Sequence, residues 1–134
     1  MVVDVLLSQD PILRARAFLK RYFPRVEMQV PHAWPWKSTL IVLRDGGGAG
    51  EYDRVLTDAR LTVEVSDPSV KVASDTARRV LALLHEWPRL ESGVYFRSEA
   101  GRPAYFPDDE TGTPLYTFTV NLAFKHVPAV VPAI

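Results

Sequence analysis

The sequence predicts an α+β fold: an antiparallel or mixed β-sheet of about four to five strands, with two amphipathic helices packed on one face. Three observations predict it. Two segments repeat apolar residues at helical spacing, and several shorter segments alternate apolar with polar residues. The connections between consecutive strand segments are short or rich in glycine, which favours neighbouring strands that run antiparallel.

The first helix is predicted over residues 10–23. Asp10 can cap the free backbone N–H groups at its start, and Pro11 fits the first helical position, where its missing N–H costs nothing. Apolar residues follow at helical spacing until Pro24 stops the run. The other side of this helix carries a local excess of positive charge, the basic helix face, which comprises Arg14, Arg16, Lys20, Arg21 and the adjacent Arg25.

Three strands are predicted to follow this helix. Residues 25–30 alternate in the manner of a half-buried strand, and residues 60–66 alternate most regularly of all. Residues 39–44 are a β-branched run without alternation, as in a strand covered on both faces or lying at an interface. Between these strands, two prolines exclude regular structure at 31–36, and residues 45–50 form a glycine-rich loop.

The second helix is predicted to begin at Asp67 and Pro68, which repeat the cap-plus-proline start, and to be closed by Pro88. One apolar stripe runs along it over about five turns, so one face should be buried against the sheet. The stripe consists of Val70, Ala73, Ala77, Val80, Leu81, Leu84 and Trp87.

The last part of the chain predicts a strand at 94–97, a turn at 108–112 and a long strand over 116–125. Residues 127–134 are apolar and uncharged, and their prolines exclude a central strand. We therefore expect a single domain over residues 1–126 followed by a C-terminal arm. The arm would lie on another subunit or on a neighbouring ring or, alternatively, fold back onto its own sheet; its candidate contact residues are Val130, Val131 and Ile134.

Composition excludes several classes of protein. The 16 Lys and Arg residues balance 16 Asp and Glu residues, which argues against a strongly basic nucleic-acid-binding module. Without cysteine there is no disulfide framework, thiolate nucleophile or Cys-based zinc site. No apolar run approaches the roughly 20 residues of a membrane span, and the start of the chain lacks the basic residues of a signal peptide. We expect no membrane partner.

No pattern announces catalysis. The glycine run at 46–50 lacks the Lys-Ser/Thr of a P-loop and the last glycine of a dinucleotide fingerprint. We interpret the loop from Gly46 to Asp53, which includes Gly47, as a mobile hairpin tip without a catalytic role that orders only against a neighbouring subunit. His32, His85 and His126 lie far apart, outside any HExxH frame, and His85 is expected to face the carbonyl end of the second helix. We predict no enzyme, no catalytic residue, no cofactor and no metal site.

Three groups are candidates for interaction. The basic face of the first helix is either a solvated face or a contact with DNA or an acidic partner; in the second case, reversing its charges would affect assembly and not fold stability. Two tryptophans flanked by prolines either fill the end of the sheet or a contact between subunits, or they stack on bases or sugars. An acidic turn, without the alternating ligands of an EF-hand, is either solvated or meets the basic helix of a neighbour. The candidate residues of the basic helix face are Arg14, Lys20 and Arg21. The two tryptophans are Trp34 and Trp36, and the acidic turn consists of Asp108, Asp109 and Glu110.

A succession of stretches, in a fixed order, covers nearly the whole chain: 17–19 (AFL), 31–35 (PHAWP), 42–47 (VLRDGG), 58–65 (DARLTVEV), 77–84 (ARRVLALL) and 107–120 (PDDETGTPLYTFTV). This succession resembles the tail terminator (tail completion) proteins of long-tailed phages, especially those of actinobacterial hosts. Ser66 stands where such proteins often have an aromatic residue, and the tail at 127–134 lies outside the pattern.

The resemblance implies a structural ring, of six subunits, that caps the tail tube, stops its polymerisation and offers the surface for joining the head. It implies the tail tube protein and head-closure or connector proteins as partners, with DNA in the channel as a further candidate contact. The location implied is the neck of the virion, after assembly in the host cytoplasm. The alternatives are a head-closure or connector ring, a tail tube subunit and, from a different class, a nucleic-acid-binding accessory protein.

Overall fold

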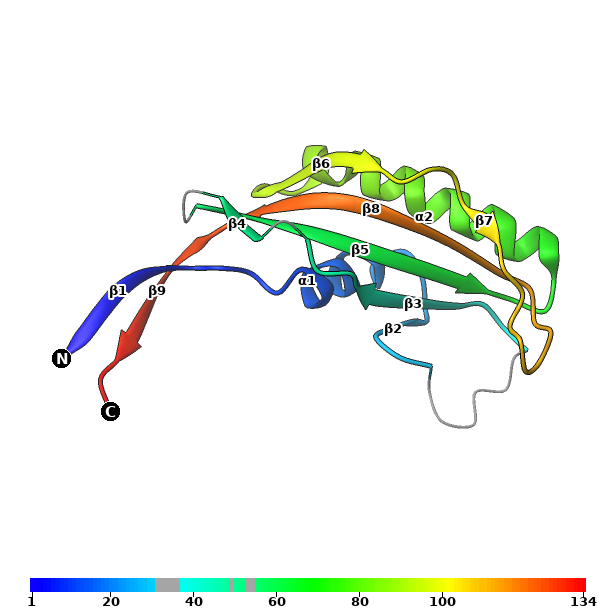
Figure 1. Ribbon diagram of the computed structural model, residues 1–134, viewed down its shortest axis with the longest axis horizontal. Helices are drawn as coiled ribbons and strands as arrows, with labels where there is room; N and C mark the ends of the chain where they lie inside the picture. The colour runs from blue at the N-terminus through cyan, green and yellow to red at the C-terminus, as the bar shows by residue number, and fades with distance from the viewer. Residues whose placement is uncertain (31–36, 49, 53–54) are drawn as a thin grey trace.

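Two long antiparallel strands, β5 (Leu56–Ser66) and β8 (Leu115–Lys125), form the centre of the sheet and pair along their whole length (Figure 1). The computed structural model describes residues 1–30, 37–48, 50–52 and 55–134. Five further strands join the central pair: β2 (Val26–Glu27), β3 (Leu40–Asp45), β4 (Gly50–Tyr52), β6 (Val94–Glu99) and β7 (Ala104–Tyr105). Among the described residues the order is β2-β3-β5-β8-β6, with β4 paired to β5 and β7 to β8.

The predicted α+β class is confirmed, but the number of strands was predicted too low. The sheet is mixed. Strand β2 runs parallel to β3, whereas the other pairs of neighbouring strands in the sheet run antiparallel. The strands of this sheet that were not predicted, β4 and β7, have three and two residues and pair with parts of the long strands. So short a segment has no room for the alternation that identifies a strand in a sequence.

Two helices, α1 (Pro11–Leu19) and α2 (Val70–Leu90), pack on the same face of this sheet. Asp10 caps α1 as predicted, since its Oδ1 accepts hydrogen bonds from the N–H groups of Ile12 (3.0 Å) and Leu13 (3.1 Å). The helix ends at Leu19 and not at residue 23, and the chain continues in turns.

The bounds of α2 differ from the prediction at both ends. Ser69 is the cap, because its Oγ accepts from the Val72 N–H at 3.3 Å. Asp67 instead accepts from the Ser69 N–H and from the Thr39 hydroxyl (2.8 and 2.6 Å), so it links the start of the helix to the segment before β3. Pro88 lies within the last turn, where its missing N–H removes only one helical hydrogen bond, and the helix continues to Leu90.

The core lies between the helices and the inward-facing residues of the sheet. As predicted, Leu61, Val63 and Val65 are buried there, as are most residues of the apolar stripe of α2. Trp87 is fully buried; its ring stacks on Phe18 of α1 and meets Phe124 of β8 edge-on, with centroids 4.7 and 5.6 Å apart. These three rings join both helices to the sheet.

The burial of β3 confirms the interpretation of residues 39–44. Ile41 and Leu43 face the core under the helices, while Leu40 and Val42 form a second small buried cluster. Every residue from 40 to 43 is therefore buried, which explains why the run does not alternate.

Two strand and loop predictions need correction. The strand predicted over 25–30 is reduced to Val26–Glu27, with Met28 and Val30 exposed, because only its start pairs with β3. In the glycine loop, Gly46 donates to the Arg60 carbonyl and Arg60 donates to the Gly47 carbonyl (2.8 and 2.7 Å). These bonds extend the pairing of β3 with β5, and residues 50–52 then form β4, so part of the predicted loop is strand.

Candidate interaction surfaces

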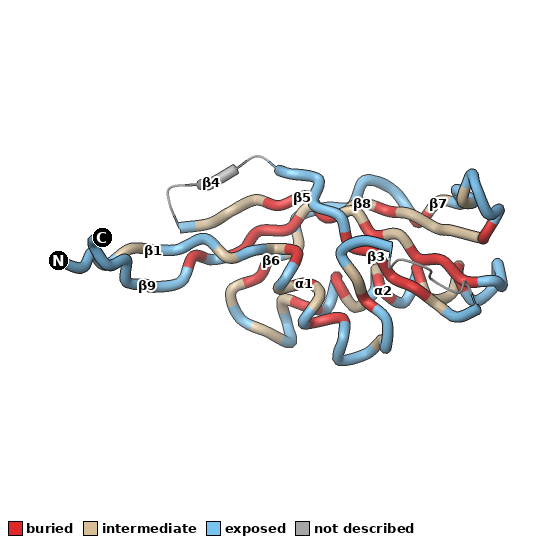
Figure 2. The backbone as a smooth tube through the Cα atoms, turned by 90° about the horizontal axis from the view of Figure 1, so that it is seen from below, coloured by how far each residue is buried: buried red, intermediate tan, exposed pale blue. Residues whose placement is uncertain are grey.

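Both ends of the chain together form an exposed two-stranded ribbon. Strand β1 (Val2–Leu7) pairs antiparallel with β9 (Val127–Pro132) over six residue pairs. The ribbon projects from the body with both termini at its tip, and it is mostly exposed (Figures 1 and 2). Within the part of the chain that the structure describes, β1 and β9 make extensive contacts only with each other.

Both faces of this ribbon are apolar. Strand periodicity and register place alternate residues of β1 and their partners in β9 on the same face. We call one face the aliphatic face, comprising Val3, Val5, Leu7, Val127, Ala129 and Val131. We call the other the Asp4 face, because it holds the single charged side chain of the two strands; it comprises Val2, Asp4, Leu6, Pro128, Val130 and Pro132.

The ribbon changes the interpretation of the C-terminal tail. Residues 127–132 do not fold back onto the main sheet; they pair with an N-terminal strand that was not predicted. Val130 and Val131 remain 57% and 51% exposed, and Ile134 is fully exposed. A free two-stranded ribbon is only marginally stable in water, and apolar patches of this kind mark contact surfaces. The contact with another subunit stays a prediction.

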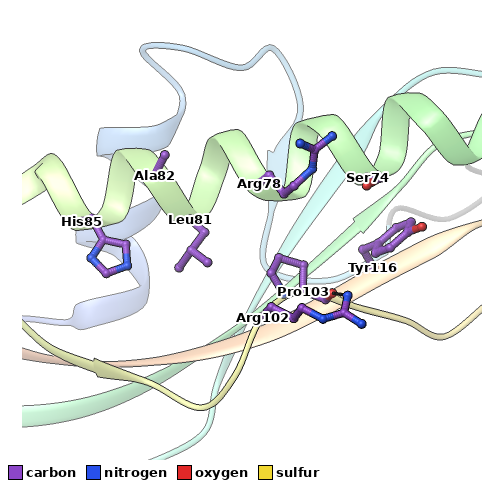
Figure 3. A pocket seen from close by; sticks show the side chains of 8 residues that line it. All are labelled: Ser74, Arg78, Leu81, Ala82, His85, Arg102, Pro103 and Tyr116. Atoms are coloured by element: carbon purple, nitrogen blue, oxygen red, sulfur yellow. Dashed lines mark hydrogen bonds between the residues drawn. The ribbon is translucent and has the colours of Figure 1, made fainter.

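A second apolar surface is a pocket of about 450 Å³ (Figure 3). It lies between α2, the segment that leads into β7, and the start of β8. Arg78 on α2 and Arg102 on the facing loop both line the cavity, and in this view their guanidinium groups point to opposite sides. The remaining lining is mostly apolar and comprises Ser74, Leu81, Ala82, His85, Pro103 and Tyr116. An apolar cavity with a cationic border suits an apolar segment that carries a carboxylate.

Two residues that line this pocket have partners within the chain. Arg78 forms an ion pair with Asp75, one turn earlier on α2. His85 Nε2 lies 2.7 Å from a carboxylate oxygen of Glu99, and its ring stacks on Phe96. Because α2 continues to Leu90, His85 lies more than a turn from the helix end, so it does not face the terminal carbonyl groups as expected.

The basic helix face is largely engaged inside its own chain. Arg14 donates to the Gln9 side chain (2.7 Å) and to the Ser92 carbonyl (2.8 Å), and it lies 3.6 Å from the Glu91 carboxylate. Arg21 reaches the same carboxylate at 3.1 Å, whereas Lys20 is exposed. Charge reversal of both arginines would therefore disturb the α1–α2 contact, contrary to the expectation that fold stability would be unaffected.

We accordingly expect Arg14→Ala to lower the free energy of unfolding by about 1.5–3 kcal/mol, the range for hydrogen bonds to charged groups. The side chain is 22% exposed and bridges α1 to the end of α2. Chemical denaturation measures the loss. Lys20→Ala, at the exposed C-cap of the same helix, is the matched control and should change stability by less than about 0.5 kcal/mol; equal losses for both variants would contradict the assignment.

In the acidic turn, Asp108 has a structural role. Its Oδ1 accepts hydrogen bonds from the N–H groups of Glu110 (3.0 Å) and Thr111 (2.9 Å) and from the Thr111 hydroxyl (3.1 Å). The Thr111 N–H is the main cause that lowers the pKa of Asp108 below its ordinary 3.8. Asp109 and Glu110 are exposed, and their contact with a neighbour stays a prediction.

Asp108→Ala should destabilise the protein at neutral pH by about 1 kcal/mol, as loss of a capping acceptor does. Because the folded-state pKa lies below the unfolded value of 3.8, the carboxylate stabilises the fold above that pH. This contribution disappears as the pH falls through the folded-state pKa. Melting temperatures of the two proteins should differ at pH 7 and converge below pH 3.8; a constant difference would contradict this role.

The remaining predicted residues are placed as follows. Trp34 and Trp36 lie outside the described residues. Gly47 adopts a positive φ of 80° with its N–H donating to Asp45 Oδ1 at 2.8 Å, which explains the need for glycine at this turn. His126 is buried at the base of the ribbon, where its Nε2 lies 2.7 Å from the Thr57 hydroxyl. Among the described residues, no three His, Asp or Glu side chains gather as metal ligands would.

Sequence reasoning missed β1, and with it Asp4. The signal was present, since residues 2–7 and 127–132 share an apolar composition with a single charge, but only the pairing shows that they belong together. Nothing in the sequence marked Arg78 and Arg102 as neighbours.

Neither described helix has the length and hydropathy that crossing a membrane requires.

No protein-family model matches the chain, and a search of curated proteins finds no matching sequence. The interpretation of function therefore depends on the surfaces described above. The ribbon and the pocket are chemically different surfaces on one chain.

Proposed function

We propose that this protein is a structural, ring-forming component of a virion, a tail terminator that caps the tail tube and joins it to the head. The observation that carries the proposal is the ribbon of β1 and β9. It exposes branched aliphatic residues on both faces and makes no extensive contact with the described body. Burial of such side chains is worth about 1.5–3 kcal/mol each before ordering costs, so a partner surface is favoured.

The arrangement offers the two dissimilar surfaces that a ring contact uses. The exposed ribbon and the pocket beside α2 are dissimilar, and a contact between dissimilar patches generates a ring when the rotation closes. The ordered stretches that resemble tail terminators support a position for this ring at the end of the tail tube. The proposed assembly has six subunits and needs neither a cofactor nor a catalytic residue.

The face of the sheet opposite the helices gives less support to the nucleic-acid alternative. There Arg44 pairs with Glu64 at 2.6 Å and Arg97 pairs with Asp58 at 2.7 Å. Paired guanidinium groups have less charge available for phosphate than free ones. The proposal is therefore a structural role, with head closure as the competing position for the same ring.

Two experiments test this proposal. Negative-stain imaging and light scattering of the purified protein should show closed rings, whereas a monomer at all concentrations would contradict it. Co-expression with the tail tube protein of the same virus should give tubes that carry the ring at one end and stop growing. Rings that leave tube growth unchanged and bind head connectors instead would favour the head-closure position.

A further inference from the structure

We propose that the Asp4 face of the ribbon docks into the pocket beside α2 of a second copy of this chain. The inference rests on the proposed function, because it names the contact that would repeat around the ring. It assigns the ribbon and the pocket, two surfaces with no partner in the described chain, to each other.

Charge complementarity selects the Asp4 face. Asp4 is the single charged residue of β1 and β9, and two arginines, Arg78 and Arg102, are among the residues that line the pocket. A carboxylate that reaches an arginine at the edge of this apolar cavity would gain a charge-assisted hydrogen bond. The aliphatic face has no charge to offer these arginines. Asp75 already pairs with Arg78, so Arg102, which has no carboxylate partner among the described residues, would bind Asp4.

The apolar surroundings also correspond. In the register, Asp4 lies opposite Val130, and Val2 and Leu6 lie two residues away on the same face. These side chains would replace water against the apolar lining of Leu81, Ala82, Pro103 and Tyr116. The cavity of about 450 Å³ lies within the size range of pockets that bind compact groups.

The contact must be intermolecular. Figure 1 shows the ribbon at one end of the molecule, while α2 and β7, which border the pocket, lie toward the other end. Neither β1 nor β9 makes extensive contact with α2 or β7 in its own chain. A ribbon that leaves one subunit and enters the next is a head-to-tail contact, the type that closes into rings.

Cysteine cross-linking tests the contact directly, since the natural chain contains no cysteine. Val130→Cys on the Asp4 face combined with Ala82→Cys in the pocket should give, under mild oxidation, a ladder of covalent oligomers up to the ring. Val131→Cys with Ala82→Cys is the matched control, because Val131 is adjacent but points to the opposite face. An equal ladder for both pairs, or none for the first, would overturn the docking.

A charge exchange gives an independent readout. Asp4→Lys, or Arg78→Glu with Arg102→Glu, should raise the concentration for half-assembly by at least about tenfold, and the combination should restore it. Arg79→Glu, exposed on the same helix and outside the pocket, is the control. Rings that form equally well in all these variants would contradict the docking but not the proposed function. A wild-type chain that never assembles would contradict both.

Discussion

A chain that ends at His126 should stay monomeric at concentrations where the full chain forms rings, while its melting temperature changes by less than about 3 °C. The removed residues form β9, whose extensive contacts within the described chain are with β1 alone. Their loss leaves the core between the helices and the sheet intact. It removes half of the exposed apolar ribbon and leaves β1 without its partner.

Light scattering over a concentration series and a thermal melt measure the two effects separately. Replacing Val130 by Thr keeps the shape of the side chain and the strand, so this variant shows how much of the loss comes from apolar burial alone. A clearly lower melting temperature for the truncated chain would place β9 in its own core. Ring formation by the truncated chain would exclude the ribbon as the subunit contact.

Trp87→Ala should lower the free energy of unfolding by about 3–5 kcal/mol, the range for a large aromatic residue removed from a core. Trp87 is fully buried, stacks on Phe18, meets Phe124 and donates its Nε1–H to Glu91 at 2.9 Å. The substitution leaves a cavity where both helices meet the sheet. For a domain of this size, the melting temperature should fall by about 10–20 °C.

Urea or thermal unfolding followed by circular dichroism measures this loss. Trp87→Phe keeps the stack on Phe18 but not the hydrogen bond, so it should cost clearly less. Leu90→Ala, on the exposed end of the same helix, is the control and should cost less than about 1 kcal/mol. A loss below about 1 kcal/mol for Trp87→Ala would show that the three-ring contact does not hold the layers together.

The sequence by itself determined the features that repeat within one segment. The alternation over 60–66 predicted the central strand, and Asp10 predicted the start of α1, because each depends on neighbours a few residues away. The apolar stripe of α2 predicted its buried face for the same reason. From these elements the α+β class and the placement of both helices on one face followed.

Only the tertiary structure decided the contacts between distant segments. The pairing of β1 with β9 joins residues more than a hundred positions apart, and two apolar runs do not state which partner they take. Arg14 was expected to be solvated or to meet a partner, and it is held by Glu91 because two helices meet there. Likewise, Arg78 and Arg102 border one pocket only because the chain folds back across α2. Local periodicity records which face of a segment is buried; the identity of the surface that buries it depends on the packing of the whole chain.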